Sequence, residues 1–354
     1  MKSGSVLQVI ASADRRGAET FALALGAALE QRDWTIRTIA LQPGEHHDLE
    51  VEVLGRRPRG VATLKSLRRV AREHDLVVAH GSTTLSACAA ALAFTDQRFV
   101  YRNIGDPDYW SLTRLSKFRT RTFLRRATKV VALSNTSERT LQQRFGVALG
   151  KSCVIPTGVS AAQNAPASTE ERWAARGMLG LPREQRVAAV IGALSPEKGA
   201  DLAVNAMASV AAVDTLLFAG DGPDRVALEE LAHARAPGRV RFLGSLRDVS
   251  PVYQAADLIV LPSRTEGLPA VLIESGMRGI PVVATDVGYV RDIVLDSITG
   301  VIVRPDDPTA LAVGIEEALA LGDKGGAAAG AHCCEHFDLE LVADRWDTLL
   351  RATT

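Results

Sequence analysis

Two glutamates, Glu266 and Glu274, enclose seven residues at the end of a predicted strand and the start of a predicted helix. Between them, Gly267 lets the backbone approach a ligand closely, and Pro269 suits the first turn of a helix. Such a helix offers free amides and the positive end of its dipole to a phosphate. A carboxylate at its mouth can accept hydrogen bonds from sugar hydroxyls, and one two turns further along can bind a ribose diol. A Glu that only complements the helix dipole is the alternative interpretation.

Two glycine-containing loops in the same half of the chain also follow predicted strands. The first runs from Gly192 to Gly199 and contains one cation, Lys198. The second is a short turn at 220–222 with the sequence Gly-Asp-Gly. Open α/β sheets bind ligands outside the carboxyl ends of their strands, so we expect these loops to line a site. A solvent-exposed cap residue is the alternative interpretation of Lys198.

Polar residues also follow predicted strands in the first half of the chain. His80 ends one strand, and a lone His there is as readily structural as functional. Arg102 and Asn103 close another strand. The Asp-Pro-Asp triplet at 106–108 has the D-x-D form of a metal motif, but Asp-Pro pairs mark turns. We therefore expect no metal site at this triplet.

Short apolar segments alternate with helical patterns throughout the chain, which predicts parallel sheets covered by helices on both faces. The strands predicted in the first half are Val6–Ile10, Thr35–Ala40, Leu76–Ala79, Phe99–Arg102 and Lys129–Leu133. Those predicted in the second half are Val187–Ile191, Thr215–Ala219, Val240–Leu243, Leu258–Leu261, Val282–Ala284 and Val301–Val303. The predicted helices include Ala18–Gln31 and Leu85–Phe94. The fold class is therefore α/β, with two doubly wound domains.

The length of 354 residues also favours two hydrophobic cores rather than one. We place the first domain at residues 1–160 and the second at 186–330. A polar, Ala-rich stretch, a short helix and a turn at 161–185 form the predicted linker. A helical segment at 331–354 closes the chain. The cleft between the two sheets is the expected site.

The composition is that of a globular protein, with 47% hydrophobic and 23% charged residues. No apolar run is long enough to span a membrane, and the first predicted strand is too short for the apolar region of a signal peptide. The four cysteines form no C-x-x-C pair and have no His at zinc spacing, so we expect them to be reduced. These features predict a cytoplasmic protein without a structural metal.

The net charge of zero hides an asymmetry along the chain. Residues 1–160 contain 24 Lys and Arg against 14 Asp and Glu, and the remaining residues contain 17 against 27. Basic residues are concentrated between Arg114 and Lys129, interleaved with Leu and Phe and without any acid. Such a run suits a helix on an anionic membrane surface or facing an anionic acceptor, and equally a solvated helix face. It lacks the aromatic platform of a nucleic-acid site, so we expect no nucleic-acid partner.

Taken together, these blocks resemble glycosyltransferase family 4, in which two acids form an E-x7-E signature. The likeness spans nearly the whole chain, is strongest at 192–300 and is weakest at 44–75. It implies the GT-B architecture, two Rossmann-like domains that face each other across a cleft. It also implies metal-independent transfer of a hexose-type sugar, with retention at the anomeric carbon. The implied donor is a nucleotide diphosphate sugar, UDP in preference to GDP.

By this resemblance, Lys198 neutralises the donor diphosphate, Glu274 holds the ribose and Glu266 contacts the transferred sugar. The resemblance assigns the catalytic roles to Glu266, Lys198 and His80. It assigns donor binding to Gly17, Gly192, Lys198, Gly220, Glu266, Gly267, Leu268, Pro269 and Glu274. On the acceptor side it points to Gly17, Arg102, Asn103, Asp106 and Trp110.

The sequence departs from the family pattern at two places. Ala193 stands where many members carry Arg, so half of the usual cationic clamp is missing. A histidine that often follows an N-domain strand is absent, which leaves His80 as the candidate for that role. Two other functions therefore stay open, an epimerase or phosphorylase of the same fold and a non-catalytic subunit that binds the nucleotide sugar. The acceptor is expected to be anionic or lipid-linked, with peripheral contact at the inner face of the membrane through Arg114–Lys129.

Overall fold

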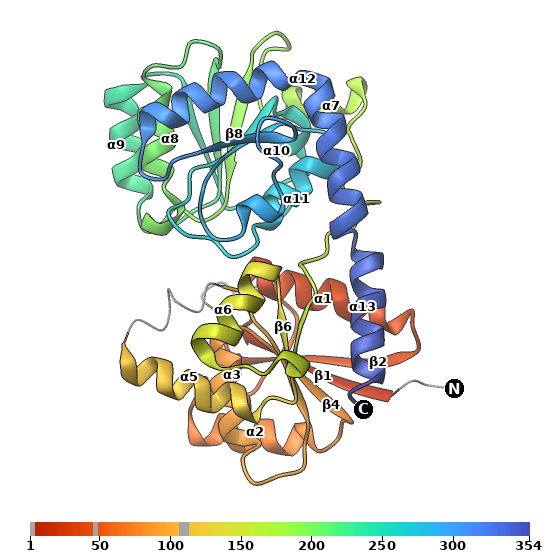
Figure 1. The fold of residues 1–354 in the computed structure, drawn as a ribbon. Helices are drawn as coiled ribbons and strands as arrows, with labels where there is room; N and C mark the ends of the chain where they lie inside the picture. Colours follow the sequence, from red (N-terminus) through yellow and green to blue (C-terminus); the bar gives the residue numbers. More distant parts are fainter. Residues whose placement is uncertain (1–3, 45–48, 106–112) are drawn as a thin grey trace. The chain divides into compact units, whose positions relative to one another are not determined.

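The computed structural model describes residues 4–44, 49–105 and 113–354. The chain divides into two compact units. Unit 1 contains Met1–Val159 together with Phe337–Thr354, and unit 2 contains Ser160–His336. Unit 2 therefore includes the segment 161–185, and the chain returns to unit 1 for its last helix. Figure 1 shows both units as a sheet with helices on either side.

Unit 1 is built on a parallel sheet with the strand order β3-β2-β1-β4-β5-β6-β7. Its strands are β1 (Gly4–Ser12), β2 (Trp34–Gln42), β3 (Glu52–Val53), β4 (Leu76–His80), β5 (Phe99–Arg102), β6 (Lys129–Ala132) and β7 (Ser152–Val154). Its helices are α1 (Gly17–Glu30), α2 (Val61–Ala71), α3 (Ser82–Ala91), α5 (Arg114–Arg126), α6 (Asn135–Phe145), the 3₁₀ turn η1 (Leu149–Lys151) and α13 (Leu339–Arg351). The strand order reverses between β1 and β4, where ligands of such sheets bind.

Unit 2 repeats this plan with the parallel order β10-β9-β8-β11-β12-β13. Its strands are β8 (Val187–Ile191), β9 (Thr215–Ala219), β10 (Val240–Gly244), β11 (Leu258–Leu261), β12 (Val282–Thr285) and β13 (Gly300–Val303). Its helices are α7 (Thr169–Met178), η2 (Pro196–Lys198), α8 (Ala200–Met207), α9 (Arg225–Arg235), α10 (Ser250–Ala255), α11 (Ala270–Met277), η3 (Val290–Asp292) and α12 (Pro308–Phe337). The order reverses between β8 and β11.

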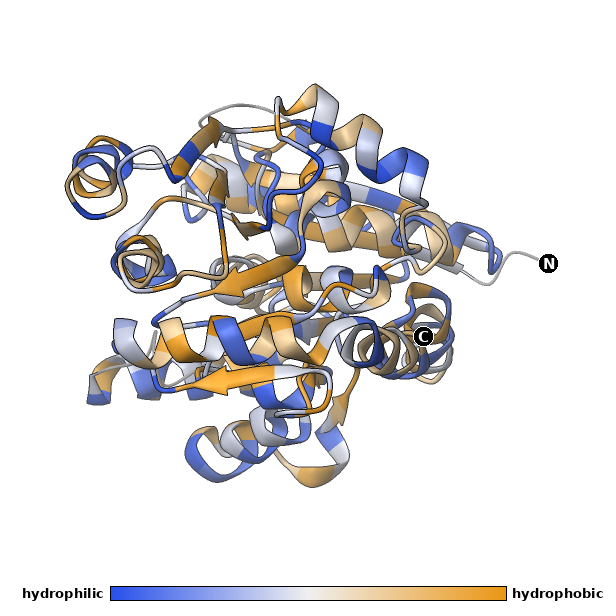
Figure 2. Cartoon of the chain, turned by 90° about the horizontal axis from the view of Figure 1, so that it is seen from above, coloured by the Kyte–Doolittle hydropathy of each residue, from blue (hydrophilic) through white to orange (hydrophobic). Residues whose placement is uncertain are grey.

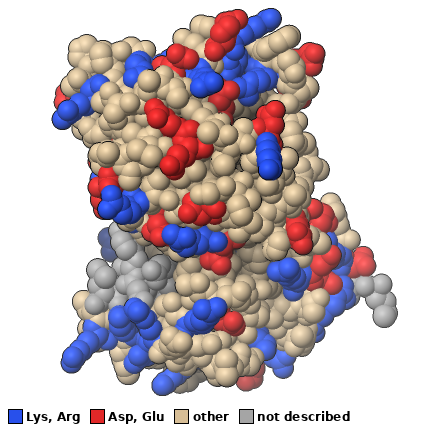
Figure 3. Space-filling view, turned by 45° about the horizontal axis from the view of Figure 1, so that its top comes forward, with Lys and Arg blue, Asp and Glu red and all other residues tan. Residues whose placement is uncertain are grey.

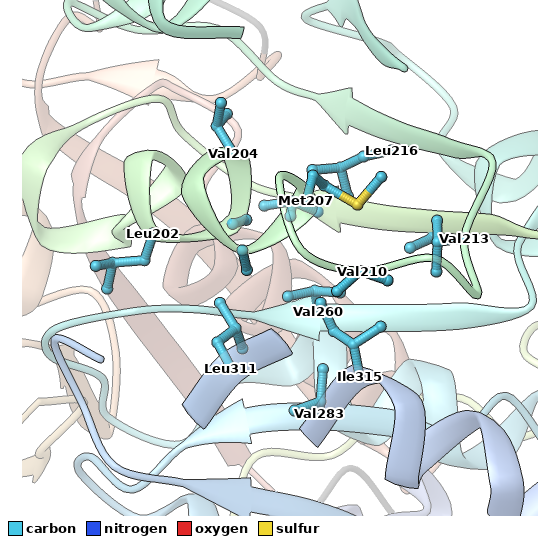
Figure 4. Close-up of a cluster of buried hydrophobic side chains, with 14 of the residues drawn as sticks. Leu202, Val204, Met207, Val210, Val213, Leu216, Val260, Val283, Leu311 and Ile315 are labelled. Atoms are coloured by element: carbon cyan, nitrogen blue, oxygen red, sulfur yellow. The ribbon is translucent and has the colours of Figure 1, made fainter. Parts of the chain in front are cut away.

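The central strands are apolar throughout because helices cover both faces of each sheet. Figure 2 shows strands in orange, while the helices mix orange with blue. In unit 2, one core cluster joins side chains of α8, β11 and α12, including Met207, Val260 and Leu311, which are labelled in Figure 4. Burial of these apolar surfaces fixes which side of each helix faces its sheet.

The C-terminal helices connect the two units in an unexpected way. The helical segment predicted at 331–354 is interrupted at Asp338, so that α12 lies in unit 2 up to His336, while α13 packs against α1 of unit 1. The side chain of Trp346 on α13 is fully buried in the core of unit 1. Leu341 is exposed because it lies on the outer side of α13.

The predicted fold class, two Rossmann-like α/β domains, is confirmed. All eleven predicted strands are present, and four of them, at Phe99, Val187, Thr215 and Leu258, have the predicted limits. Strands β3 and β7, which contain two and three residues, were not predicted. Both are edge strands of unit 1, and segments this short carry no recognisable alternation.

Candidate active site

The candidate donor site lies at the carboxyl edge of the sheet in unit 2, where the strand order reverses. The loop from Gly192 to Lys198 follows β8, and the loop from Pro262 to Pro269 follows the neighbouring strand β11. Both loops therefore extend from adjacent parallel strands. This position is where nucleotides bind in doubly wound folds.

Lys198 and Glu266 meet between these loops. Lys198 Nζ donates to Glu266 Oε1 over 2.7 Å, and the hydroxyl of Ser263 donates to the same oxygen over 2.7 Å. The side chain of Glu266 is 8% exposed and that of Lys198 is 33% exposed. Oε2 of Glu266 makes no hydrogen bond within the described ranges. The carboxylate is thus oriented by two donors and keeps one oxygen for a ligand.

Backbone contacts hold Lys198 in place. Gly199, the next residue, has a φ of +63°, and a Cβ there would lie 2.1 Å from the carbonyl oxygen of Pro262. Only glycine permits this approach of the two loops. The amide of Arg264 also donates to the carbonyl of Glu197 over 2.8 Å. The position of Lys198 is therefore set by the β11 loop as well as by its own.

Arg264 connects the same loops to neighbouring segments through ion pairs. Its guanidinium binds both carboxylate oxygens of Asp201 at 2.8 Å and Asp306 at 2.7 Å. These contacts raise the pKa of Arg264, with the hydrogen bonds to Asp201 as the main cause, and those same bonds lower the pKa of Asp201. Because these two carboxylates hold its guanidinium, Arg264 is poorly placed to replace the cation that is missing at position 193.

The amino end of α11 follows the Glu266 loop. Pro269 is the N-cap residue and Ala270 begins the helix, one position later than the sequence analysis placed it. No side chain caps this end. Gly288, with a φ of +56°, brings the next loop against it, and Tyr289 donates its amide to the carbonyl of Gly267 over 3.0 Å. Gly267, the buried Leu268 and Pro269 thus shape an uncapped, amide-rich helix end.

Glu274 lies in the second turn of α11 and is held by a tyrosine from α10. The hydroxyl of Tyr253 donates to Glu274 Oε2 over 2.5 Å. Burial, and after it the Glu274 carboxylate, raises the pKa of Tyr253 well above its ordinary value. Arg278 lies 5.0 Å above the Tyr253 ring. Tyr253 was not predicted as a site residue, because no local spacing in the sequence relates it to Glu274.

The glycine loops after β8 and β9 are joined by backbone hydrogen bonds. The amide of Gly192 donates to the carbonyl of Ala219 over 3.0 Å, and the amide of Leu194 donates to the backbone carbonyl of Asp221 over 3.0 Å. Gly220 donates to Gly244 over 2.9 Å. Ala193 is exposed at this edge of the sheet. A longer side chain at position 193 therefore has solvent to extend into.

In unit 1, His80 is buried rather than open to a ligand. The side chain is 2% exposed, and Nε2 lies 2.9 Å from Gln8 Oε1. Phe21 and Trp346 pack around the imidazole, each with a ring separation of 6.5 Å. Burial, assisted by the charge of Arg102, holds the pKa of His80 well below its ordinary value. The neutral imidazole is the form that this site accepts.

The acceptor-side candidates occupy the carboxyl ends of the neighbouring strands. Arg102 is buried over the ring of Phe21 at 3.9 Å, donates to Thr157 Oγ1 over 2.8 Å, and has its pKa lowered to about 9 by burial. Asn103 is buried, accepts a hydrogen bond from Tyr101 and donates to the carbonyl of Gly105. Gly17 begins α1. Asp106 and Trp110 lie outside the described residues.

Helix α5 carries most of the basic run Arg114–Lys129. Leu115 and Phe118 on this helix are 68% and 64% exposed. In Figure 3, Lys and Arg side chains gather at the lower left of the face shown, the region in which Figure 1 places α5. Some of these cations have structural partners, since Arg126 donates to three carbonyls and Arg121 to that of Arg144.

Two absences apply to the described residues only. None of their His, Cys, Asp and Glu side chains gather into a group of three that could hold a metal ion. None of their helices is long and apolar enough to cross a membrane.

Comparisons with known families match both units. The model of Glycosyltransferase Family 4 matches residues 15–163, and the model of glycosyl transferases group 1 matches residues 185–320. TuaC of Bacillus subtilis, which is named as a teichuronic acid biosynthesis glycosyltransferase, is 30% identical over 72% of the chain and 64% of its own length. A D-inositol 3-phosphate glycosyltransferase of Salinispora tropica is 34% identical over 52% of the chain and 42% of its own length. The chain thus spans less than two thirds of these relatives.

Solved structures with the same fold cover nearly the whole chain. HepE of Anabaena in complex with UDP-glucose superposes with a TM-score of 0.86 and 22% identity, covering 99% of this chain and 100% of that one. Sucrose-phosphate synthase of Thermosynechococcus elongatus gives a TM-score of 0.84 and 20% identity, with 98% of each chain covered. These likenesses show the GT-B fold. With both halves matched by glycosyltransferase family models, the chain belongs to the family 4 type of glycosyltransferases.

Proposed function

We propose that the protein transfers a hexose-type sugar from a nucleotide diphosphate donor, with UDP preferred to GDP, and with retention at the anomeric carbon. The observation that carries this proposal is the pairing of Lys198 with Glu266 beside the uncapped amino end of α11. A fixed cation, helix amides and an oriented carboxylate are the groups that a sugar diphosphate requires in one place. The complex of HepE with UDP-glucose supports UDP as the nucleotide.

In this proposal, unit 2 binds the donor. The diphosphate contacts the ammonium of Lys198 and the amides near Gly267 and Leu268. Oε2 of Glu266 accepts a hydrogen bond from a hydroxyl of the sugar. Glu274, which Tyr253 orients, accepts hydrogen bonds from the two ribose hydroxyls. Gly192 and Gly220 give the diphosphate close access to the backbone.

The proposed chemistry moves charge toward these donors. The bond between the anomeric carbon and the diphosphate oxygen breaks, and its electron pair stays on the diphosphate. The acceptor oxygen bonds to the same face of the anomeric carbon and gives its proton to the diphosphate that leaves. Lys198 and the helix amides stabilise the charge that develops on the leaving group, and no metal ion is needed. His80, which is buried, supports the wall of unit 1 rather than touching the sugar.

The acceptor is proposed to bind to unit 1, at the ends of β4 and β5. The relatives named for D-inositol 3-phosphate and for teichuronic acid support an anionic acceptor. The exposed Leu115 and Phe118 among the cations of α5 support a peripheral contact with an anionic membrane. Equal co-sedimentation with vesicles of phosphatidylcholine alone and of phosphatidylcholine with phosphatidylglycerol would rule out the membrane contact.

Calorimetric titration with UDP, GDP and ADP in the presence of EDTA tests the donor site. The wild-type protein is expected to bind one of them, Glu274→Gln to lose that binding, and Glu316→Gln, an exposed control on α12, to keep it. Absence of binding to all three would contradict the proposal. For the stereochemistry, the anomeric configuration of the first-formed product is read by proton NMR, and an inverted product would contradict retention.

Ala193 favours a second candidate function. Without the second cation of the usual clamp, the site could retain nucleotide binding while its turnover is lost. A subunit that binds the nucleotide sugar without transferring it would still bind UDP in the calorimetric titration. It would release no UDP from UDP-sugars with any acceptor, which distinguishes it from the enzyme.

A further inference from the structure

A small pocket lies in unit 1 between α3 and α5. It has a volume of about 250 Å³ and is formed by α3, one side of α5 and the turn before α2. Its lining residues are Arg59, Ser82, Leu85, Ser86, Ser116, Arg119, Thr120 and Phe123. Drug-sized ligands occupy pockets of roughly 300 to 1,000 Å³, so this pocket suits one chemical group of a larger molecule.

The pocket is cationic. It is lined by two arginines, Arg59 and Arg119, and by no acidic side chain among the described residues. Arg59 Nε donates to Ser86 Oγ over 2.8 Å, while its two Nη nitrogens make no hydrogen bond within the described ranges. Arg119 is exposed and has no ion pair or hydrogen bond with the described part of the chain. Two guanidinium groups in one small pocket repel each other unless an anion lies between them.

The remaining lining residues fit the same ligand chemistry. Ser82, the first residue of α3, offers its hydroxyl, and Ser86 in the second turn accepts the hydrogen bond from Arg59. Ser86 also donates to the carbonyl of Thr83 over 2.9 Å, so its oxygen is fixed and in turn orients Arg59. Leu85 and Phe123 provide apolar walls. Bidentate guanidinium groups with hydroxyl donors are the usual recognition set for a phosphate ester.

The position of the pocket relates it to the proposed acceptor region. Ser82 follows the carboxyl end of β4 by two residues, and β4 pairs with β5, whose carboxyl end holds Arg102 and Asn103. A phosphate group held by Arg59 and Arg119 would therefore belong to a molecule on the same edge of the sheet as the proposed acceptor.

We infer that Arg59 and Arg119 form a phosphate subsite, which binds a phosphate ester group of the acceptor. The inference rests on the proposed function for the identity of the bound molecule as acceptor. The phosphate could be that of a water-soluble sugar phosphate or of a lipid headgroup. The chemistry of recognition is the same for both.

The test uses the full chain saturated with UDP, so that the donor site is occupied. Glucose 6-phosphate and vesicles of phosphatidylcholine with phosphatidic acid serve as the soluble and the lipid probe. The variants are Arg59→Gln and Arg119→Gln. The matched control is Arg69→Gln, an exposed arginine of α2 that lies outside the basic run of α5 and does not line the pocket. Each pocket variant is expected to weaken binding of at least one probe by about tenfold, as for loss of one charge-assisted hydrogen bond.

Selective loss in the two pocket variants supports the subsite, and the probe that responds identifies the source of the phosphate. Equal weakening in Arg69→Gln would show a diffuse charge effect and overturn the inference. Wild-type protein that binds neither probe would overturn it as well. UDP affinity, measured in the same preparations, is expected to stay unchanged in all three variants. A failure of UDP binding itself would count against the proposed function, not against the subsite.

Discussion

The hydroxyl oxygen of Tyr253 lies 2.5 Å from Oε2 of Glu274 and joins α10 to α11 across the edge of unit 2. Because Tyr253 is buried and its pKa is raised, this hydroxyl stays protonated and acts as a donor. The carboxylate is therefore fixed in one orientation before any ligand arrives. Fixed acceptors bind a diol with less loss of side-chain entropy than mobile ones.

Tyr253→Phe is accordingly expected to weaken UDP binding by about tenfold, the effect of one hydrogen bond to a charged group. Calorimetric titration measures it. Tyr101→Phe, which removes a buried hydroxyl from unit 1, is the matched control and should bind UDP like the wild type. If both variants bind UDP equally well, Tyr253 serves only the packing of α10.

The second prediction concerns Lys198 and the nearly buried Glu266. In Lys198→Met, Glu266 keeps only the hydrogen bond from Ser263, and a poorly compensated carboxylate costs about 1–3 kcal/mol of the free energy of unfolding. UDP binding is expected to fall by tenfold or more, since about 1.4 kcal/mol corresponds to tenfold. Thermal unfolding and calorimetry measure the two effects.

The double variant Lys198→Met with Glu266→Gln separates these effects. It removes the unpaired charge, so its stability should return toward that of the wild type, whereas UDP binding should not return. Recovery of UDP affinity in the double variant would show that Lys198 acts only by neutralising Glu266.

The third prediction restores the missing cation. Ala193 is exposed next to the Gly192 and Gly220 loops, so the side chain of Ala193→Arg can extend without displacing the core. If the diphosphate binds there, the new guanidinium should tighten UDP binding by about tenfold. Ala193→Gln, of similar length and without charge, is the control. Equal affinity in the two variants would place the diphosphate elsewhere.

Much of the fold could be predicted because its signals are local. Buried parallel strands are continuous apolar runs, and Val187–Ile191 and Leu258–Leu261 were located from that property alone. The strands β3 and β7 are too short to carry it. The division between α12 and α13 depends on Trp346 entering the core of unit 1, a tertiary contact that the residue pattern at 331–354 does not reveal.

The residues of the candidate site likewise fall into those that the sequence predicts and those that it does not. Lys198, Glu266 and Glu274 stand in or next to segments after strands whose residue types indicate their chemistry, and the structure brings Lys198 to Glu266 across 68 positions of sequence. Ser263 and Tyr253, which orient the two carboxylates, have no such signal, because their hydroxyls are common residue types placed by packing. From the sequence alone, His80 is equally compatible with a ligand-binding role and with a place in the core. Only its burial in the structure distinguishes these two interpretations.

The burial of His80 gives a prediction about pH. Its pKa in the folded protein lies well below the ordinary value of 6.5, so below that pH the unfolded chain binds a proton that the folded protein does not. The contribution to stability is therefore complete above pH 6.5 and is lost as the pH falls, by up to about 1.4 kcal/mol per pH unit. His80→Gln should remove this dependence.

Urea unfolding followed by tryptophan fluorescence measures the effect in a Trp173→Phe background, because Trp173 lies in unit 2 while Trp34 and Trp346 report on unit 1. His233→Gln, which removes an exposed histidine from unit 2, controls for the loss of a histidine as such. Between pH 7.5 and 5.5, the wild type and the His233 variant should lose stability faster than His80→Gln, on the order of 1 kcal/mol. Parallel curves for all three would mean that His80 takes up its proton in the folded state. The imidazole would then need a second proton acceptor at Nδ1, which is buried and has no hydrogen-bond partner among the described residues, whereas Nε2 already lies beside Gln8 Oε1.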